Sequence, residues 1–319
     1  MTQLNPLKIA ITGASGFLGA AALDYFSLDP GVSEIRGLFS RAPTRELSSK
    51  VVSLVGELTN PILSRSLVEG VDLVIHFANR GFPSDRNLDP ARFISNNLLA
   101  TDQLLHAMKQ VGTQNLVYAS SGGAIYKDSK PHHPYREESP TLFRTPYAAT
   151  KLISEYVIQE FSKKWNLNST ILRISNPYGL GQLNREKQGF IGVVLGKLLR
   201  HEPVQIWSSL DIVKDFIYID DVLSAVDSVL KNSTPLSGVY NLGSGTGTSL
   251  MEVIQTIETV TERQVQFELK SNPIPENQWT VLDCSKFMKA TGWKCQHKLE
   301  DGIEELWDHL VSELEVKAA

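Results

Sequence analysis

Short apolar, β-branched runs alternate with amphipathic stretches over the first 175 residues of the chain. Runs of strand length lie at 8–12, 34–39, 51–55, 72–77, 116–120 and 170–174. Amphipathic stretches predict helices at 17–27, 92–110 and 146–164. Because strands and helices alternate, and because the strand runs are almost continuously apolar, the pattern predicts an α/β fold with a doubly wound parallel sheet.

The pattern changes after about Ser175. The sequence NPYGLG at 176–181 predicts a loop. Later elements are predicted as helices at 189–200, 220–231, 250–262 and 302–313, a strand at 214–219, a short segment of unassigned type at 203–207, and an irregular stretch at 271–278. We therefore expect a large N-terminal sheet domain over 1–175, joined again by 210–232, and a smaller interleaved α/β domain made of 176–209 and 233–319.

Composition narrows the class of protein. The 319 residues suffice for one large or two modest domains. Lys and Arg number 31 against 35 Asp and Glu, so no basic surplus exists and nucleic acid is not an expected partner. Cys284 and Cys295 form no disulfide framework, which favours a reducing compartment. Because no signal peptide and no run of ~20 apolar residues is present, we expect a soluble cytoplasmic protein without membrane contact.

Gly13, Gly16 and Gly19 lie between the first predicted strand and the first predicted helix. Such glycines permit a tight turn, a close approach of the backbone to a pyrophosphate, and close packing of helix on strand. The helix N-terminus then holds the phosphates. The triplet predicts a Rossmann-type dinucleotide-binding turn, and a purely structural turn is the alternative.

Tyr147 and Lys151 lie four residues apart near the start of the third predicted helix, so they share one helix face. A phenol of pKa near ~10 is a poor base at neutral pH. A neighbouring ammonium favours the phenolate, which makes Tyr147 a usable acid or base. Lys151 is also placed to bind a cofactor ribose. A surface ion pair is the alternative.

Ser120 and Ser121 end the fifth predicted strand, beside Gly122. Ligands sit at this end of the strands in such sheets, so a serine hydroxyl is expected near the reacting oxygen. Capping of the turn is the alternative. A second polar cluster, His132 and His133 with the nearby glutamates, is interrupted by proline and lacks zinc-like spacing, so no metal site is expected.

Motifs spread over nearly the whole chain carry a family resemblance. They are TGASGFLG (12–19), IHFA (75–78), YASSGGAIY (118–126), PYAATK (146–151), RISNPYG (173–179), KDFIYIDD (214–221) and YNLGSGTGTSL (240–250). With these motifs the chain resembles the extended short-chain dehydrogenases/reductases of the NAD-dependent epimerase/dehydratase family, in the branch typified by UDP-glucose (UDP-galactose) 4-epimerase. The motifs are specific for the family and only weakly specific for the substrate.

The resemblance implies roles for individual residues. The pyrophosphate turn would be formed by Gly13, Ser15, Gly16, Phe17, Leu18 and Gly19. Other cofactor contacts would come from Ser40, Arg41, Glu57, Leu58, Phe77, Ala78, Asn97, Ser120, Tyr147 and Lys151. Tyr147 would be the catalytic acid or base, with Lys151 as its electrostatic partner. The substrate would be bound by Gly122, Asn176, Lys214 and Thr280.

Two departures from the family pattern affect catalysis and cofactor choice. The catalytic Ser or Thr of typical epimerases aligns with Gly122, so Ser121 would supply the hydroxyl from one position earlier. The second strand is followed by Ser40 and Arg41, without an acid for an adenosine ribose diol. These two residues suit a 2′-phosphate, so NADP is expected as an alternative to NAD. A solvated loop residue is the alternative interpretation of Arg41.

Further departures affect the substrate. Lys214 stands where Arg is usual and cannot form the same bidentate contact with a diphosphate. Pro273 replaces an expected Arg, for which Lys270 would substitute. Thr280 stands where related epimerases carry a bulky aromatic residue, so we expect room for an N-acetylated sugar, although Trp279 is adjacent.

Two classes of function follow. The first is an enzyme acting on a nucleotide-activated hexose. We favour a 4-epimerase for a UDP-hexose or UDP-N-acetylhexosamine, in which hydride passes to tightly bound NAD and returns to the opposite face. An NADPH-dependent reductase of a 4-keto-6-deoxy nucleotide sugar is the alternative, supported by Ser40 and Arg41. The second class, a non-catalytic dinucleotide sensor, is disfavoured by the intact Tyr147 and Lys151.

A homodimer is expected, with the predicted helices at 92–110 and 146–164 paired across a two-fold axis. The family resemblance and the apolar positions on these long helices motivate this expectation.

Overall fold

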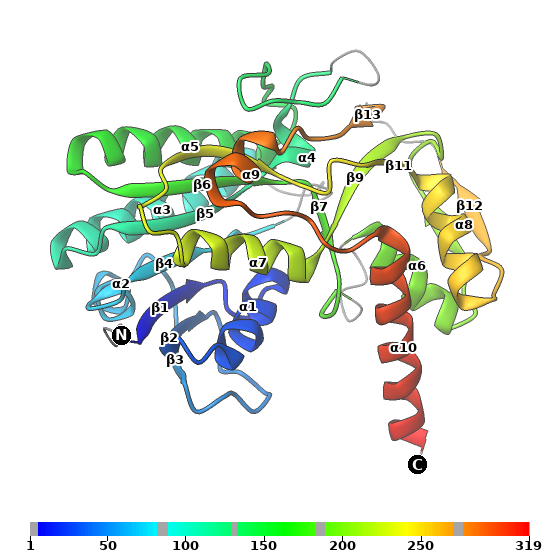
Figure 1. The fold of residues 1–319 in the computed structure, drawn as a ribbon, viewed down its shortest axis with the longest axis horizontal. Helices are drawn as coiled ribbons and strands as arrows, with labels where there is room; N and C mark the ends of the chain where they lie inside the picture. Colours follow the sequence, from blue (N-terminus) through cyan, green and yellow to red (C-terminus); the bar gives the residue numbers. More distant parts are fainter. Residues whose placement is uncertain (1–5, 82–88, 129–132, 183–188, 271–276, 319) are drawn as a thin grey trace. The chain divides into compact units, whose positions relative to one another are not determined.

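The computed structural model describes residues 6–81, 89–128, 133–182, 189–270 and 277–318. The chain forms two compact units (Figure 1). The first contains Met1–Ile125, Leu142–Arg173 and Val226–Tyr240, and the second contains Tyr126–Thr141, Ile174–Ala225 and Asn241–Ala319. The domain ranges drawn from the sequence, with a boundary at 175 and a return of 210–232, stay a prediction that limited proteolysis would test.

The first unit is built on a seven-stranded sheet. In sheet order its strands are β10 (Gly238–Leu242), β6 (Asn168–Ile174), β5 (Asn115–Ser121), β4 (Leu73–His76), β1 (Leu7–Thr12), β2 (Val32–Phe39) and β3 (Val51–Val55). β1 pairs in parallel with β2 and β4, β2 with β3, and β4 with β5. Because the chain starts in the middle of the sheet and adds strands first to one side and then to the other, the predicted doubly wound sheet is confirmed.

Helices cover both faces of this sheet. One face carries α2 (Pro61–Val68), α3 (Pro90–Val111) and α5 (Pro146–Trp165), of which α3 and α5 run side by side (Figure 1). Their buried apolar side chains form a core with the strands that includes Leu67, Leu104, Met108, Ile158 and Ile171. The other face carries α1 (Phe17–Leu28), because Leu23 lies against Gly37 of β2.

The start of α5 places the candidate catalytic residues. Thr145 is its N-cap, and the Thr145 hydroxyl accepts the backbone N–H of Ala148 at 3.1 Å. Pro146 occupies the first turn, where its missing N–H costs nothing. The helix therefore begins immediately before Tyr147, and Tyr147 projects from its first turn.

The second unit contains a small mixed sheet and a separate strand pair. β9 (Val213–Tyr218) pairs antiparallel with β11 (Gly247–Ser249) and parallel with β7 (Asn176–Tyr178) and β13 (Trp279–Thr280). β8 (Val204–Ile206) pairs with β12 (Phe267–Leu269). The helices are α6 (Phe190–Leu199), α8 (Leu250–Thr261), α9 (Ser285–Thr291) and α10 (Leu299–Ala318), and α7 (Ile219–Leu230) begins in this unit.

Several elements differ from the sequence prediction. Residues 176–178, predicted within a loop, form β7 because their backbone pairs with β9. The short elements α2, α4 (Gly122–Ile125) and α9 and the strands β10–β13 were not predicted, since they are too short to show a period. The predicted irregular stretch at 271–278 lies mostly outside the described residues, as does Pro273.

No helix in the described part of the chain is both long enough and apolar enough to cross a membrane.

Candidate active site

The glycine turn joins β1 to α1 as predicted. Gly13 has φ +70°, and a Cβ there would lie 2.8 Å from the Ala78 backbone. A Cβ on Gly19 would lie 2.1 Å from the Gly13 carbonyl oxygen, so both positions exclude any side chain. Gly16 is the N-cap of α1 and provides no side-chain cap, which leaves the first N–H groups of α1 for an anion.

The other residues of this turn divide between surface and core. Ser15 is exposed, Leu18 is half-buried, and Phe17 is buried. The turn thus combines the uncapped helix end with a close approach of backbone to backbone, which is what a dinucleotide pyrophosphate requires. These residues fit a bound NAD(P).

The end of β2 carries Ser40 and Arg41, and both are exposed. Within the described residues Arg41 has no hydrogen-bond or ion-pair partner. The nearby Arg45 is engaged, because its guanidinium donates to Asp24 at 2.7 Å. Arg41 is therefore the available cation at the place where an adenosine ribose would lie.

The segment after β4 is held by Asn97 of α3. Asn97 is buried, and its side-chain oxygen accepts the Arg80 backbone N–H at 2.7 Å. Its amide donates to the Phe93 carbonyl at 3.0 Å. Phe77 and Ala78 are half-buried at the start of this segment. Asn97 thus supports the segment proposed to line the cofactor site.

Glu57 and Leu58 follow β3. Leu58 is buried in the core, whereas Glu57 is exposed and forms an ion pair with Arg80. The Glu57 carboxylate is thus bound to the segment after β4, and its contact with an adenine stays a prediction.

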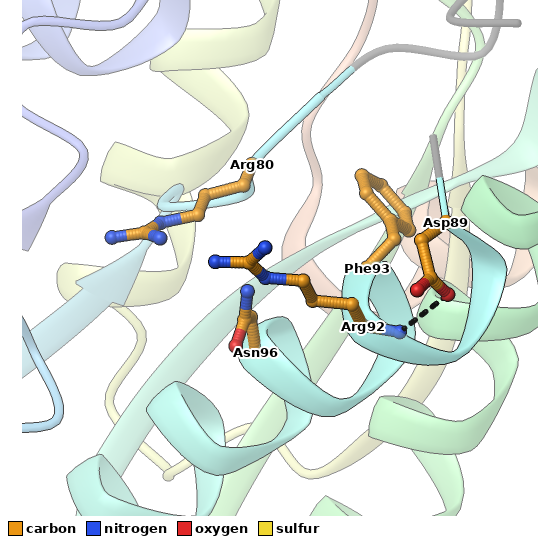
Figure 2. A pocket seen from close by; sticks show the side chains of 5 residues that line it. All are labelled: Arg80, Asp89, Arg92, Phe93 and Asn96. Carbon is orange, nitrogen blue, oxygen red and sulfur yellow. Dashed lines mark hydrogen bonds between the residues drawn. The ribbon is translucent and has the colours of Figure 1, made fainter. Parts of the chain in front are cut away.

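A pocket of about 280 Å³ lies beside this segment and is lined by Arg80, Asp89, Arg92, Phe93 and Asn96. Figure 2 shows the guanidinium groups of Arg80 and Arg92 and the side-chain amide of Asn96 directed to the same side of the pocket. Asp89 accepts the backbone N–H of Arg92 at 3.2 Å and caps α3. Two neighbouring guanidinium groups favour an anionic ligand group.

His76 connects β1, β4 and α3 through a buried chain of hydrogen bonds. Its Nδ1 lies 2.7 Å from the Thr12 hydroxyl, and its Nε2 lies 3.1 Å from the Thr101 hydroxyl. Thr12 accepts the Ala78 N–H, and Thr101 donates to the Asn97 carbonyl. Burial, with a smaller effect of the Lys151 cation, lowers the pKa of His76 to about 3, so the ring is neutral.

The Ser121 hydroxyl lies close enough to the Tyr147 phenol to affect its pKa. Ser121 is the last residue of β5, and it is followed by the buried Gly122, which opens α4. Burial raises the pKa of Tyr147, and the Ser121 hydroxyl partly offsets this, so the phenol is protonated at neutral pH. The expectation that Lys151 favours the phenolate stays a prediction.

Lys151 is 4% exposed and donates from Nζ to the Ala119 carbonyl at 2.8 Å. Nζ lies 5.0 Å from the centre of the Tyr118 ring and 5.7 Å from that of Tyr147. Burial lowers the pKa of Lys151 to about 7, and the carboxylate of Glu155 opposes this shift. The protonation of Lys151 is therefore balanced near neutral pH.

Ser120 has a different partner from Ser121. Its hydroxyl donates to the Glu155 carboxylate. Glu155 is also bound by Arg173, whose Nη2 lies 2.7 Å from Oε2. Ser120 is thus bound to a buried ion pair, whereas Ser121 is the serine whose hydroxyl affects the pKa of Tyr147.

The candidate substrate residues Asn176 and Lys214 lie in the second unit. Asn176 is half-buried in β7, and its amide donates to the backbone carbonyl of Asp215 at 2.8 Å. Lys214 is half-buried in β9, and its Nζ lies 3.5 Å from the Asn277 carbonyl oxygen. Both side chains are oriented by the small sheet.

Thr280 pairs with Lys214 through the β13–β9 ladder. It is 1% exposed, and its hydroxyl has no hydrogen-bond partner among the residues that the structure describes. Asp215, next to Lys214, is fully buried and accepts three backbone N–H groups and the Ser244 hydroxyl. Burial nevertheless raises the pKa of Asp215 to about 6.

Comparison with known proteins decides the family. Residues 9–243 match the NAD dependent epimerase/dehydratase family. The chain belongs to this family. As the resemblance predicted, it is an NAD(P)-dependent nucleotide-sugar enzyme of the extended short-chain dehydrogenase/reductase type.

Individual members of the family differ in activity. The dTDP-4-dehydro-6-deoxyglucose reductase of Escherichia coli is 29% identical over 312 residues, which cover 93% of this chain and 96% of that protein. The UDP-glucose 4-epimerase of Mycolicibacterium smegmatis is 25% identical over 305 residues, with the same coverage.

Among solved structures, the UDP-glucose 4-epimerase of Thermotoga maritima matches with a TM-score of 0.88 at 23% identity, covering 97% of this chain and 100% of that one. The Thermus thermophilus UDP-glucose 4-epimerase, solved with NAD, matches with a TM-score of 0.85 at 25% identity, covering 96% and 99%.

Sequence reasoning missed the supporting groups Thr12, His76, Thr101, Glu155 and Arg173. The spacing of Glu155, four residues after Lys151, was the available signal. No comparable signal exists for His76, because its partners Thr12 and Thr101 come from two other elements, β1 and α3. In the described part of the chain, no three His, Cys, Asp or Glu side chains are grouped to hold a metal ion.

Proposed function

We propose that this family member is an NADPH-dependent reductase of a nucleotide-linked 4-keto-6-deoxyhexose. When bound, NADPH supplies the hydride for the ketone carbon. Tyr147 donates its phenolic proton to the ketone oxygen, Ser121 orients that phenol, and Lys151 stabilises the phenolate that remains. Gly13, together with the uncapped start of α1, holds the pyrophosphate.

The end of β2 is the observation that carries this proposal. Arg41 is exposed and has no partner in the described chain, while Arg45 is bound to Asp24. No carboxylate directly follows the strand to accept the two ribose hydroxyls that NAD presents. A free guanidinium beside a serine instead suits the 2′-phosphate of NADP.

The state of Tyr147 is compatible with a reductase. Burial raises the pKa of Tyr147, so the phenol is protonated at neutral pH. A protonated phenol is the form that reduction of a ketone consumes, whereas oxidation of an alcohol begins with the phenolate. Similarity to the dTDP-4-dehydro-6-deoxyglucose reductase suggests the substrate to test first.

A nucleotide-sugar 4-epimerase is the second candidate. It is supported by the fold match to UDP-glucose 4-epimerases and by relatives of that name at 25% identity. The same Tyr147, Ser121 and Lys151 would serve, and tightly held NAD would return each hydride to the sugar.

The deciding experiment follows absorbance at 340 nm with dTDP-4-dehydro-6-deoxyglucose and NADPH, and separately follows UDP-glucose and UDP-galactose interconversion. We expect stoichiometric NADPH oxidation. Arg41→Ala should weaken NADPH binding by about ten- to a hundredfold, the size of a lost charge-assisted contact, and should spare NADH. Arg45→Ala is the matched control and should change neither. Interconversion without net change at 340 nm, together with no effect of Arg41→Ala, would establish the epimerase instead.

The homodimer stays a prediction. Leu99 of α3 and Tyr156 of α5 are 58% and 64% exposed, and such apolar side chains on two adjacent helices suit a two-fold interface. Light scattering at micromolar concentration tests this, and a monomer would contradict it.

A further inference from the structure

Tyr147, Lys151 and Glu155 are spaced four residues apart on α5, so they form one stripe along the helix. Glu155 is the innermost of the three and is 2% exposed. Arg173 of β6 binds both carboxylate oxygens, with Nε at 3.0 Å and 3.2 Å and Nη2 at 2.7 Å. Ser120 of β5 donates its hydroxyl to the same carboxylate. The position of the carboxylate is therefore fixed from two strands.

Lys151 is placed differently. In the described part of the chain, the only hydrogen bond that its Nζ donates goes to the Ala119 carbonyl. An ammonium carries three N–H donors, so two remain for the Tyr147 oxygen and for a ribose. A direct ion pair with Glu155 would use these donors. Arg173 and Ser120 hold the Glu155 carboxylate in place, so its negative charge stays one helical turn away from the Lys151 ammonium.

Among the groups around Lys151, Glu155 is the one that favours the charged form of its ammonium. They are neutral His76 from β4, Tyr118 from β5, Tyr147 and Glu155 from α5, and Arg173 from β6 behind Glu155. Burial lowers the pKa of Lys151 to about 7, and within the described residues Glu155 is the carboxylate that opposes this.

We propose that Glu155 is a positioning residue that keeps Lys151 charged for proton transfer through Tyr147, and that Arg173 and Ser120 hold its carboxylate for this purpose. The proposal rests on the roles of Tyr147 and Lys151 in the proposed function. A structural role alone would make Glu155 a partner for Arg173 and would leave the titration of Lys151 unchanged.

The direct test is an NMR titration of protein labelled with [ε-13C]lysine, in which the Lys151 resonance is assigned by its loss in Lys151→Arg. The measurement needs no turnover. Glu155→Gln keeps the shape and removes the charge, so the Lys151 midpoint should fall by at least about one pH unit. Glu160→Gln is the matched control: Glu160 lies on the same helix and pairs with Lys163 at its surface, so the midpoint should not move. An unchanged midpoint in folded Glu155→Gln would overturn the proposal.

Glu155→Gln removes the carboxylate that faces the buried Arg173 guanidinium, and breaking a buried ion pair is destabilising, so a second variant is needed. Glu155→Gln/Arg173→Gln removes both charges, and the Lys151 midpoint should again fall. If it does not, the proposal is overturned in that background as well.

Activity then separates this proposal from the proposed function. The alkaline limb of the pH–rate profile should move to lower pH together with the Lys151 midpoint. A midpoint that moves while the profile of the reductase stays fixed would overturn the link between Lys151 and proton transfer. Absence of reductase activity in the wild type, with the midpoint still shifted by Glu155→Gln, would overturn the proposed function and leave the electrostatic link intact.

Discussion

The two units of the chain hold their candidate residues in different ways. In the first unit, Lys151 donates a hydrogen bond to Ala119 of β5, and the Ser121 hydroxyl affects the pKa of Tyr147. In the second unit, Asn176 is hydrogen-bonded to its own sheet, and Thr280 is buried without a hydrogen-bond partner among the described residues. The candidate side chains of the first unit thus act on one another, whereas those of the second are held by the small sheet or lack a described partner.

This difference explains which parts of the function can be inferred from the structure. Proton transfer imposes a fixed geometry on Tyr147 and its neighbours, and that geometry is common to reductases and epimerases. Recognition of one nucleotide sugar imposes no such common geometry.

Tyr147→Phe should lower turnover by roughly 100- to 10,000-fold, because the phenol is the proton donor while the ring still packs. NADPH binding, measured by fluorescence, should stay near the wild-type value. Tyr156→Phe is the matched control, since Tyr156 lies on the same helix and is 64% exposed. Full activity of Tyr147→Phe would show that Tyr147 is not the proton donor.

The two units should respond oppositely to acid. His76 in the first unit has a pKa lowered to about 3, so its contribution to stability is fully present above pH 6.5 and is lost as the pH falls. Asp215 in the second unit has a pKa raised to about 6, so its contribution is present below pH 3.8 and is lost as the pH rises through 6. From pH 7 to 5, His76 should cost about 2 kcal/mol and Asp215 should add about 1 kcal/mol.

Urea unfolding at both pH values checks these signs. Relative to His76→Gln, the wild type should lose about 2 kcal/mol between pH 7 and 5. Relative to Asp215→Asn, it should gain about 1 kcal/mol. Equal pH dependence of wild type and both variants would contradict the assigned protonation states.

Ser121→Ala should lower kcat by about tenfold, because we propose that Ser121 hydrogen-bonds the reacting phenol during proton transfer. Ser120→Ala should cost less, because the Ser120 hydroxyl donates to Glu155. Ser120→Ala is the control for Ser121→Ala, since both serines are buried at the end of β5. A larger loss in Ser120→Ala would show that the wrong serine has been assigned to Tyr147.

Much of the fold follows from local pattern. The strand at Val51–Val55 and the helix beginning at Pro146 were predicted to the residue, because apolar runs and caps are local signals. The strand Asn176–Tyr178 was missed, since only its pairing with β9 makes it a strand. The glycine turn, Tyr147 and Lys151 were likewise found from spacing. The Glu155–Arg173 pair and the His76 chain were not, because they join side chains from elements far apart in the sequence.

Thr280→Val gives the smallest expected effect and tests the second unit directly. Valine has nearly the same shape and removes a buried hydroxyl that has no partner in the described chain. Leaving such a group unpaired costs about 1–3 kcal/mol, so the free energy of unfolding should stay equal or rise. If the hydroxyl binds the nucleotide sugar, KM should increase by roughly two- to tenfold with kcat unchanged, since one neutral hydrogen bond is lost. Thr261→Val, at a buried threonine whose hydroxyl bonds Ile257 within α8, is the control and should leave KM unchanged. An unchanged KM in Thr280→Val would exclude Thr280 from the substrate site and leave Asn176 and Lys214 as the candidates in this unit.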